Sequence, residues 1–384
     1  MLRTLHLQLG KMETTRPYNG YYYRIGDILT IAVCGALCNQ TSLKDIHGWA
    51  RYPRNAEFFC QEFGIRKIPS YAQFCNIFNL ADPEKFNELF RHWVSYTFAV
   101  DPTDKTIAVD GKTIRTTLQM QDIENPLHIA SAVIADTNII IGQKAAAKKS
   151  NEIPAVQELI GLLDMRDAVV VADALNCQTK TAEAINDRGG DYLLTVKANQ
   201  RTLFHDVQQV LKNDPTAQEI TVFEKNRDRE ETRTAMVSNE ISALRNAKKW
   251  PNLASIGAIK TEFKVKGKST TAWHFYISSK LLTPETLLNH ARLEWRIESM
   301  HWLLDNHFDE DRTMLRNANA QESMNILRKI VLNMARKYRD DVLPKSSISG
   351  ILKRNSYDVY LLREFLAFFA HFFRSPEFFS FLFS

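Results

Sequence analysis

The chain has 384 residues, of which 45% are hydrophobic and 24% are charged, and its formal net charge is +5 at pH 7. This length allows two or three domains with a sizeable core, and the composition excludes a disordered or fibrous protein. The mild positive charge permits a nucleic-acid partner but does not require one.

The five cysteines are odd in number and include no close CxxC pair, so we expect reduced thiols and no zinc site. No run reaches the roughly 18 apolar residues of a membrane-spanning helix. The first residues also lack the apolar core of a secretory signal. We therefore expect a cytoplasmic protein with no membrane partner.

Residues 17–100 are predicted to form an all-helical domain. Ser42 with Asp45 resembles a capping box, and Asp82 followed by Pro83 is typical of a helix start. Short helices joined by tight turns indicate a compact domain. It could be a helix-turn-helix DNA reader or a plain helical bundle.

The pattern changes to short, β-branched runs near residue 104. The expected elements are strands at 105–110, 127–135 and 138–143, a helix at 151–163, a strand at 167–173, a helix at 177–188 and a strand at 191–197. The first three strands can form an antiparallel meander. Three strands followed by helix–strand–helix–strand is the order of a ribonuclease-H-like α/β core.

A β-rich segment at about 201–285 interrupts this core, and long helices follow it at 285–308 and 321–338. We therefore predict an α/β fold with a ribonuclease-H-like catalytic core and an inserted β-rich domain, preceded by an all-helical N-terminal domain. The predicted domains are 17–100, 104–340 with its insertion at 201–285, and a C-terminal segment at 341–384 with a Phe-rich tail.

Three carboxylates stand out against these elements. Asp110 and Asp173 each end a predicted strand, and Glu298 lies within the helix predicted at 285–308. Each residue alone is more often a cap or an ion-paired side chain. Two strand-end aspartates and a helix-borne glutamate, in that order, are the layout of a two-metal site for phosphoryl transfer on nucleic acid. Oxygen ligands of this kind favour Mg²⁺.

Long motifs surround these three residues: 107–115 (IAVDGKTIR), 171–178 (VADALNCQ), 191–200 (DYLLTVKANQ) and 295–305 (WRIESMHWLLD). They resemble the motifs of bacterial insertion-sequence transposases of the H-repeat-associated (Rhs-element-linked) family. The resemblance runs from about residue 17 to about residue 365.

The resemblance implies a DDE transposase that cuts and joins DNA with Mg²⁺, for which Mn²⁺ could substitute. By position, Asp110, Asp173 and Glu298 would be its catalytic and metal-binding residues. Its partners would be the terminal inverted repeats of its own element and the target DNA. Because two element ends must be paired, a homodimer is expected, in the bacterial cytoplasm and associated with the nucleoid when bound to DNA.

Polar residues near the three acids are the predicted DNA contacts, through phosphate neutralisation and hydrogen bonding. They are Lys112, Arg115, Lys197, Asn199, Gln200 and Arg296. The alternative for the basic members of this set is an ion pair with the carboxylates of the protein itself.

Two alternatives stay open at this point. Four acids that follow Glu298 could replace it as the third acid: Asp305, Asp309, Glu310 and Asp311. The chain could also be a catalytically inactive relic that keeps its fold and its DNA binding. The Phe-rich tail after about residue 366 and the stretch 227–233 depart from the family pattern and favour a relic. A metal-dependent nuclease or phosphatase is a weaker alternative, because the β insertion and the helix-borne glutamate speak against it.

Overall fold

The computed structural model describes residues 23–119, 126–146, 152–226, 229–265 and 268–370, together with His6, Leu9 and Gly10. The chain divides into two compact units. The helical unit lies within Met1–Val100, Thr113–His128 and Met300–Ser384, and the α/β unit lies within Asp101–Lys112 and Ile129–Ser299. The Phe-rich tail from residue 371 and the departure from the family pattern at residues 227 and 228 fall outside the described residues.

The helical unit contains α2 (Ile25–Leu37), α3 (Leu43–Ala50), α4 (Pro53–Phe63), α5 (Tyr71–Leu80), α6 (Pro83–Thr97), α7 (Arg115–Gln119), η3 (Glu310–Arg312), α12 (Ala318–Val342), α13 (Ile348–Tyr357) and α14 (Val359–Ala370). Helix α12 packs against α2, α5, α6 and α13. The N-terminal region is therefore helical, as the sequence predicts.

The predicted helix starts are present. Ser42 Oγ accepts a hydrogen bond of 3.1 Å from the backbone N of Asp45. Asp82 Oδ1 accepts one of 3.0 Å from the backbone N of Glu84, directly after Pro83 at the first helical position. Each cap satisfies a backbone donor that the first helical turn would leave unpaired.

The α/β unit is built on a mixed sheet whose strands are β1 (Thr106–Thr113), β2 (His128–Ile134), β3 (Ile139–Ala145), β4 (Val169–Ala172), β5 (Asp191–Val196), β6 (Gln218–Asn226), β7 (Arg229–Ser238), β8 (Ser255–Val265) and β9 (Lys268–Ser278). Within the described residues the sheet has nine strands, in the order β3-β2-β1-β4-β5-β9-β8-β7-β6. β1, β4 and β5 are parallel, whereas β2 and β3 are antiparallel to each other.

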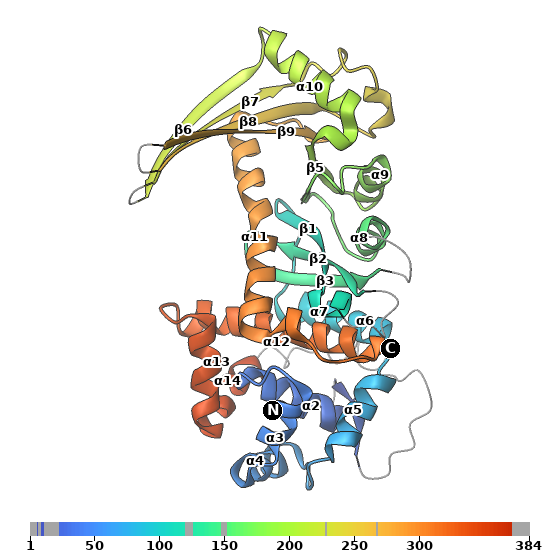
Figure 1. Cartoon of the computed structure of the whole chain (residues 1–384), viewed down its shortest axis with the longest axis vertical. Coiled ribbons are helices and arrows are strands. Elements are labelled where there is room, and N and C mark those ends of the chain that lie inside the picture. Colours follow the sequence, from blue (N-terminus) through green and yellow to red (C-terminus); the bar gives the residue numbers. More distant parts are fainter. Residues whose placement is uncertain are drawn as a thin grey trace. The chain divides into compact units, whose positions relative to one another are not determined.

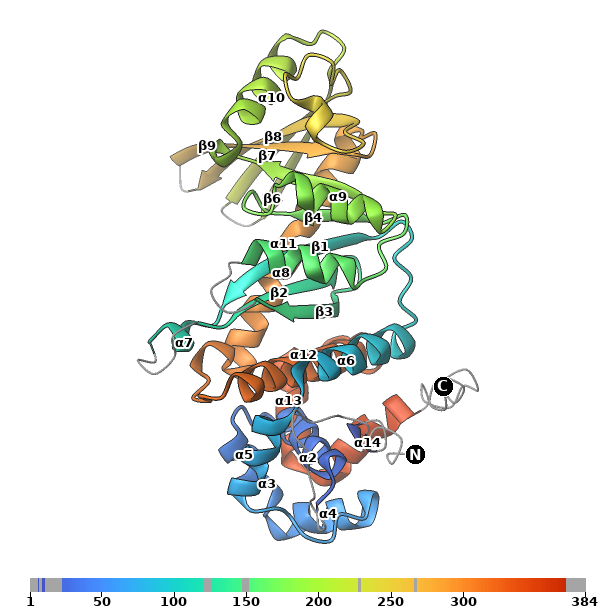
Figure 2. The same cartoon turned by 90° about the vertical axis from the view of Figure 1, so that its right-hand side faces the viewer.

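The helices and 3₁₀ turns that accompany this sheet are α8 (Glu152–Gly161), α9 (Thr179–Asp187), η1 (Ala198–Gln200), α10 (Arg201–Asn213), η2 (Ala247–Lys249) and α11 (Pro284–Phe308). Helices α8 and α9 lie on one side of β1, β4 and β5, and α11 lies on the other (Figures 1 and 2). All four residues of β4 are buried, as expected for a parallel strand covered on both faces.

The predicted insertion continues the sheet of the core. β9 pairs antiparallel with β5, with Leu193 opposite Ser278 and Val196 opposite Phe275. β8, β7 and β6 follow in turn, and α10 packs against β7, β8 and β9. The sequence shows the strands of the insertion but not the strand to which they attach.

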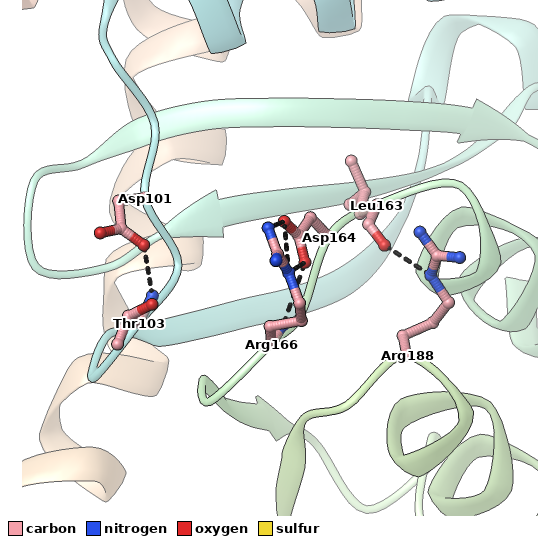
Figure 3. Close-up of polar contacts among 6 residues, drawn as sticks. All are labelled: Asp101, Thr103, Leu163, Asp164, Arg166 and Arg188. Carbon is pink, nitrogen blue, oxygen red and sulfur yellow. Dashed lines mark hydrogen bonds and ion pairs between the residues drawn. The ribbon is translucent and has the colours of Figure 1, made fainter.

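The start of β4 is anchored by its preceding turns, shown in Figure 3. Arg166 Nη2 donates a hydrogen bond of 2.7 Å to Asp164 Oδ2. Arg188 Nε, just after α9, donates one of 2.8 Å to the carbonyl oxygen of Leu163. Because β4 is only four residues long, fixing its start also fixes where its other end emerges.

Candidate active site beside β1 and β4

Asp110 and Asp173 lie side by side in the α/β unit. Val109 on β1 is in register with Ala172 on β4, and the two strands are parallel. Asp110 follows Val109 within β1, and Asp173 directly follows the last residue of β4, so both carboxylates emerge at the same level of the sheet. Because β1 continues to Thr113, Asp110 does not end its strand as the sequence predicts. Both residues are partly buried. The structure thus brings together two of the three predicted catalytic acids.

The carboxylate of Asp173 is held by Asn176. The backbone N and the side-chain Nδ2 of Asn176 donate hydrogen bonds of 3.1 Å and 3.0 Å to Asp173 Oδ1. Asn176 is fully buried, so its orientation is set by packing. This residue was not predicted from the sequence, although an asparagine three positions after an aspartate is a recognisable turn signal.

Two of the predicted DNA contacts brace the loop that follows Asp173. Asn199 Nδ2 donates a hydrogen bond of 2.6 Å to the carbonyl oxygen of Ala174. Gln200 Nε2 donates one of 3.0 Å to the carbonyl oxygen of Cys177. The amide donors of both side chains are therefore engaged within the protein.

Glu152, which was not predicted from the sequence, lies against the residue that follows Asp110. A Cβ atom added to Gly111 would lie 2.6 Å from both the Cβ and the Cδ of Glu152. Glu152 begins α8 and is partly buried. Burial, and then the negative charges of Asp110 and Asp173, raise the pKa of Glu152 above its ordinary value.

Glu294 on α11 also faces the two aspartates. Thr195 Oγ1, on β5, donates a hydrogen bond of 3.4 Å to Glu294 Oε2. Burial, and then the charges of Asp173 and Asp110, raise the pKa of Glu294 to about 7, against opposing effects of Thr195 and Lys197. Its position four residues before Glu298 was the available sequence signal, since such residues share a helix face.

Glu298, the predicted third acid, lies one turn further along α11 and is exposed. Within the described part of the chain, its side chain has no hydrogen bond or ion pair. Its role as the third acid stays a prediction.

The donor chemistry of these side chains suits a divalent cation. Asp110 and Asp173 repel the carboxylates of Glu152 and Glu294, and a cation bound among them would offset that repulsion. Among the residues that the structure describes, no three Asp, Glu, His or Cys side chains converge closely enough to hold one ion as they stand. Coordination would therefore require neighbouring carboxylates to rotate toward Asp173, whose Oδ1 is held by Asn176.

The remaining predicted DNA contacts have different surroundings. In the α/β unit, Lys197 and Arg296 are exposed and Lys112 is partly buried. In the helical unit, Arg115 Nε lies 3.3 Å from Asp311 Oδ2, and its backbone N donates a hydrogen bond of 3.1 Å to Asp311 Oδ1. The ion-pair alternative is thus present for Arg115.

The other acids after Glu298 have partners within the helical unit. Asp309 Oδ2 accepts a hydrogen bond of 2.9 Å from Thr41 Oγ1. Glu310 Oε1 accepts one of 2.6 Å from Asn325 Nδ2, and Asn325 Oδ1 accepts one of 2.8 Å from Lys329 Nζ. Glu310, Asn325 and Lys329 are all buried. This network connects η3 to α12.

Arg328, next to Lys329 on α12, is a second buried cation. Burial lowers the pKa of Arg328, and the charges of Glu310, Asp309 and Asp305 oppose that shift. These three acids therefore compensate buried positive charge in the helical unit. That role favours an acid on α11 within the α/β unit as the third member of the site.

Two family models match the chain. A model described as "Transposase DDE domain" matches residues 101–334, a region that contains Asp110, Asp173 and Glu298. A model described as "DDE_Tnp_1-associated" matches residues 7–94.

Curated relatives match over most of their length. The chain is 29% identical over 359 residues to "H repeat-associated putative transposase YhhI" of Escherichia coli, which covers 90% of this chain and 93% of the relative. It is 30% identical over 268 residues to "Uncharacterized protein in dhlA 3'region" of Xanthobacter autotrophicus, with 68% of this chain and 89% of the relative covered.

Proposed function

This chain belongs to the transposase family defined by the DDE domain, and from that premise we propose that it binds the terminal repeats of a bacterial insertion sequence and catalyses Mg²⁺-dependent DNA strand cleavage and strand transfer. The observation that carries the proposal is the adjacency of Asp110, within β1, and Asp173, directly after the parallel strand β4, in the matched region. We further propose that the α/β unit is a ribonuclease-H-like core. The order β3-β2-β1-β4-β5, with helices on both faces, supports it.

Asp110, Asp173 and Glu298 are the proposed catalytic acids and would hold the metal. Bound divalent ions would lower the pKa of the attacking hydroxyl group and offset negative charge on the phosphate. Asn176 occupies Oδ1 of Asp173, which leaves Oδ2 as the oxygen that can coordinate. Because the attacking group would be water or a DNA 3′-hydroxyl group, the proposed reaction needs no serine or tyrosine nucleophile.

DNA binding follows from the basic residues near these acids. Lys112, Lys197 and Arg296 are proposed to neutralise phosphates, so DNA affinity should fall as salt rises. Asn199 and Gln200 remain proposed DNA contacts through their side-chain oxygens, because their amide hydrogens hold the loop after Asp173. We propose that the protein is a homodimer, because two element ends must be paired. We also propose that it acts in the bacterial cytoplasm.

The test is cleavage of a labelled DNA duplex that carries one terminal repeat from the region flanking the gene. Wild type would be compared with Asp173→Asn, and with Asp187→Asn as a control for an exposed aspartate of the same unit. We expect Mg²⁺-dependent cleavage by wild type and by Asp187→Asn. Asp173→Asn should bind the duplex with unchanged affinity but lose cleavage by at least about a hundredfold, because a group that helps to stabilise the transition-state charge through the metal is removed.

Each other outcome has a distinct meaning. A folded wild-type protein that binds the repeat without cutting it would favour the inactive relic. Equal cleavage by Asp173→Asn and wild type would refute the assigned acids. Cleavage with no preference for the repeat would favour a general nuclease.

A further inference from the structure

The side of α11 that faces the two aspartates carries a second glutamate, one turn before Glu298. We propose that Glu294 is a metal-binding residue of the catalytic site, a fourth carboxylate beside Asp110, Asp173 and Glu298. This inference rests on the proposed function and adds a residue to the same site.

The strand register places Glu294 at the level of the aspartates. Ala172 on β4 is in register with Leu194 on β5. Continuing that register by one residue sets Thr195 beside Asp173, and Asp173 is itself beside Asp110. The residue that accepts the hydrogen bond from Thr195 is Glu294. Its carboxylate is therefore held next to the row formed by the two aspartates and Thr195.

A second hydrogen bond fixes the rotation of α11 against the same face. His290 Nδ1 and Thr106 Oγ1 lie 2.8 Å apart. Thr106 and Asp110 are four residues apart on β1, so their side chains share one face of the sheet. His290 and Glu294 are four residues apart on α11, so they share one side of the helix. The side of α11 that carries Glu294 is thus turned toward the face that carries Asp110.

Burial separates Glu294 from Glu298. Glu298 is exposed, whereas Glu294 is partly buried. The raised pKa of Glu294 has burial as its first cause and the two aspartates among the others, which supports the proximity that the hydrogen bonds define. A partly enclosed carboxylate beside two others is a better placed ligand than an exposed one, because the protein already restricts its position.

The test is Mn²⁺ binding by the full-length protein, measured by electron paramagnetic resonance without DNA. Glu294→Gln keeps the shape of the side chain and its hydrogen bond from Thr195 but removes the charge. We expect its Mn²⁺ dissociation constant to rise at least about tenfold, as even indirect partners of metal sites cost about that much. Glu285→Gln, at the exposed first turn of the same helix, should bind Mn²⁺ as wild type does.

The Thr195→Val variant tests whether Glu294 itself binds the metal or only stabilises the structure around the site. It removes the hydrogen bond to Glu294 but leaves the carboxylate, so the Mn²⁺ dissociation constant should rise by about tenfold, as for an indirect partner of a metal site, and by less than in Glu294→Gln. Equal losses in Thr195→Val and Glu294→Gln would overturn the inference, as would wild-type affinity in Glu294→Gln.

A failure of the proposed function would give different results from a failure of the inference about Glu294 alone. If wild type bound no Mn²⁺ and cut no DNA, both proposals would fall together. If wild type bound Mn²⁺ and cut DNA, and Glu298→Gln lost Mn²⁺ affinity while Glu294→Gln did not, only the inference about Glu294 would fall.

Discussion

Asn176 donates two hydrogen bonds to one oxygen of Asp173, from its backbone N at 3.1 Å and its side-chain Nδ2 at 3.0 Å. A carboxylate with one oxygen held in this way can rotate little. The buried asparagine therefore determines where the second oxygen of Asp173 lies.

Replacing Asn176 with alanine should weaken metal binding while the backbone hydrogen bond keeps the turn. We expect Asn176→Ala to raise the Mn²⁺ dissociation constant by about tenfold, since the orientation of Asp173 is loosened. Calorimetric titration would measure this, with Asn213→Ala at the exposed end of α10 as the control. An Asn176→Ala protein that binds Mn²⁺ like wild type would show that this side chain does not orient a ligand.

Gly111 is expected to tolerate no side chain, because Glu152 lies where a Cβ atom would be placed. Gly111→Ala should lower the free energy of unfolding by about 1–3 kcal/mol, as overpacking does. Denaturant unfolding would measure it. Adding Glu152→Ala should recover most of the loss, because the obstructing side chain is gone.

The control for this pair is Gly161→Ala, at the end of α8, where an added Cβ would meet nothing within 4 Å. That variant should unfold within about 0.5 kcal/mol of wild type. Additive losses in the Gly111→Ala, Glu152→Ala double variant would contradict the contact between the two residues.

The raised pKa of Glu294 predicts how stability depends on pH in the metal-free protein. The group faces Asp173, Asp110, Thr195 and Lys197, and its pKa of about 7 in the folded protein lies above the ordinary value of 4.5. The folded state then binds the proton more tightly than the unfolded state. The stabilisation is fully present below about pH 4.5 and is lost as pH rises through about 7.

Glu294→Gln removes this dependence. In EDTA, the variant should gain stability relative to wild type as pH rises from about 4.5 to about 7, by on the order of 1.4 kcal/mol for each tenfold difference in proton affinity between the folded and unfolded states. Urea unfolding at several pH values would show it, and Glu285→Gln should not reproduce the trend. A constant difference between wild type and Glu294→Gln across this range would mean that Glu294 does not cause the pH dependence.

Glu310 is predicted to stabilise the helical unit and not to bind the catalytic metal. Glu310→Gln removes the negative charge that compensates Arg328 and, through Asn325, Lys329. The free energy of unfolding should fall by about 3–5 kcal/mol, because a buried cation loses its partner. Mn²⁺ affinity, measured below the unfolding transition, should not change.

An exposed ion pair of the same unit provides the comparison for Glu310. Glu88 Oε2 lies 3.4 Å from Lys85 Nζ at the surface of α6. Glu88→Gln should change stability by at most about 1 kcal/mol. Loss of Mn²⁺ binding in Glu310→Gln would restore this acid as an alternative to Glu298.

Local sequence determined most of the secondary structure and the two aspartates of the candidate site. The caps at Ser42 and Asp82 act within one helical turn, so their signals can be read from neighbouring residues. Asp110 and Asp173 were recognised because each follows a run of buried apolar residues, and the strand order then predicts that they meet. The family could be recognised from linear motifs for the same reason.

Tertiary structure decided which other side chains reach those aspartates. Glu294 and Glu298 occupy the same side of one helix, and only the packing of α11 on the sheet partly buries one and exposes the other. Glu152 gives no local signal, because its contact with Gly111 joins residues about 40 positions apart. The sheet pairing of β5 with β9 was likewise unpredictable, since a strand pattern specifies which face is buried but not which partner completes the hydrogen bonds.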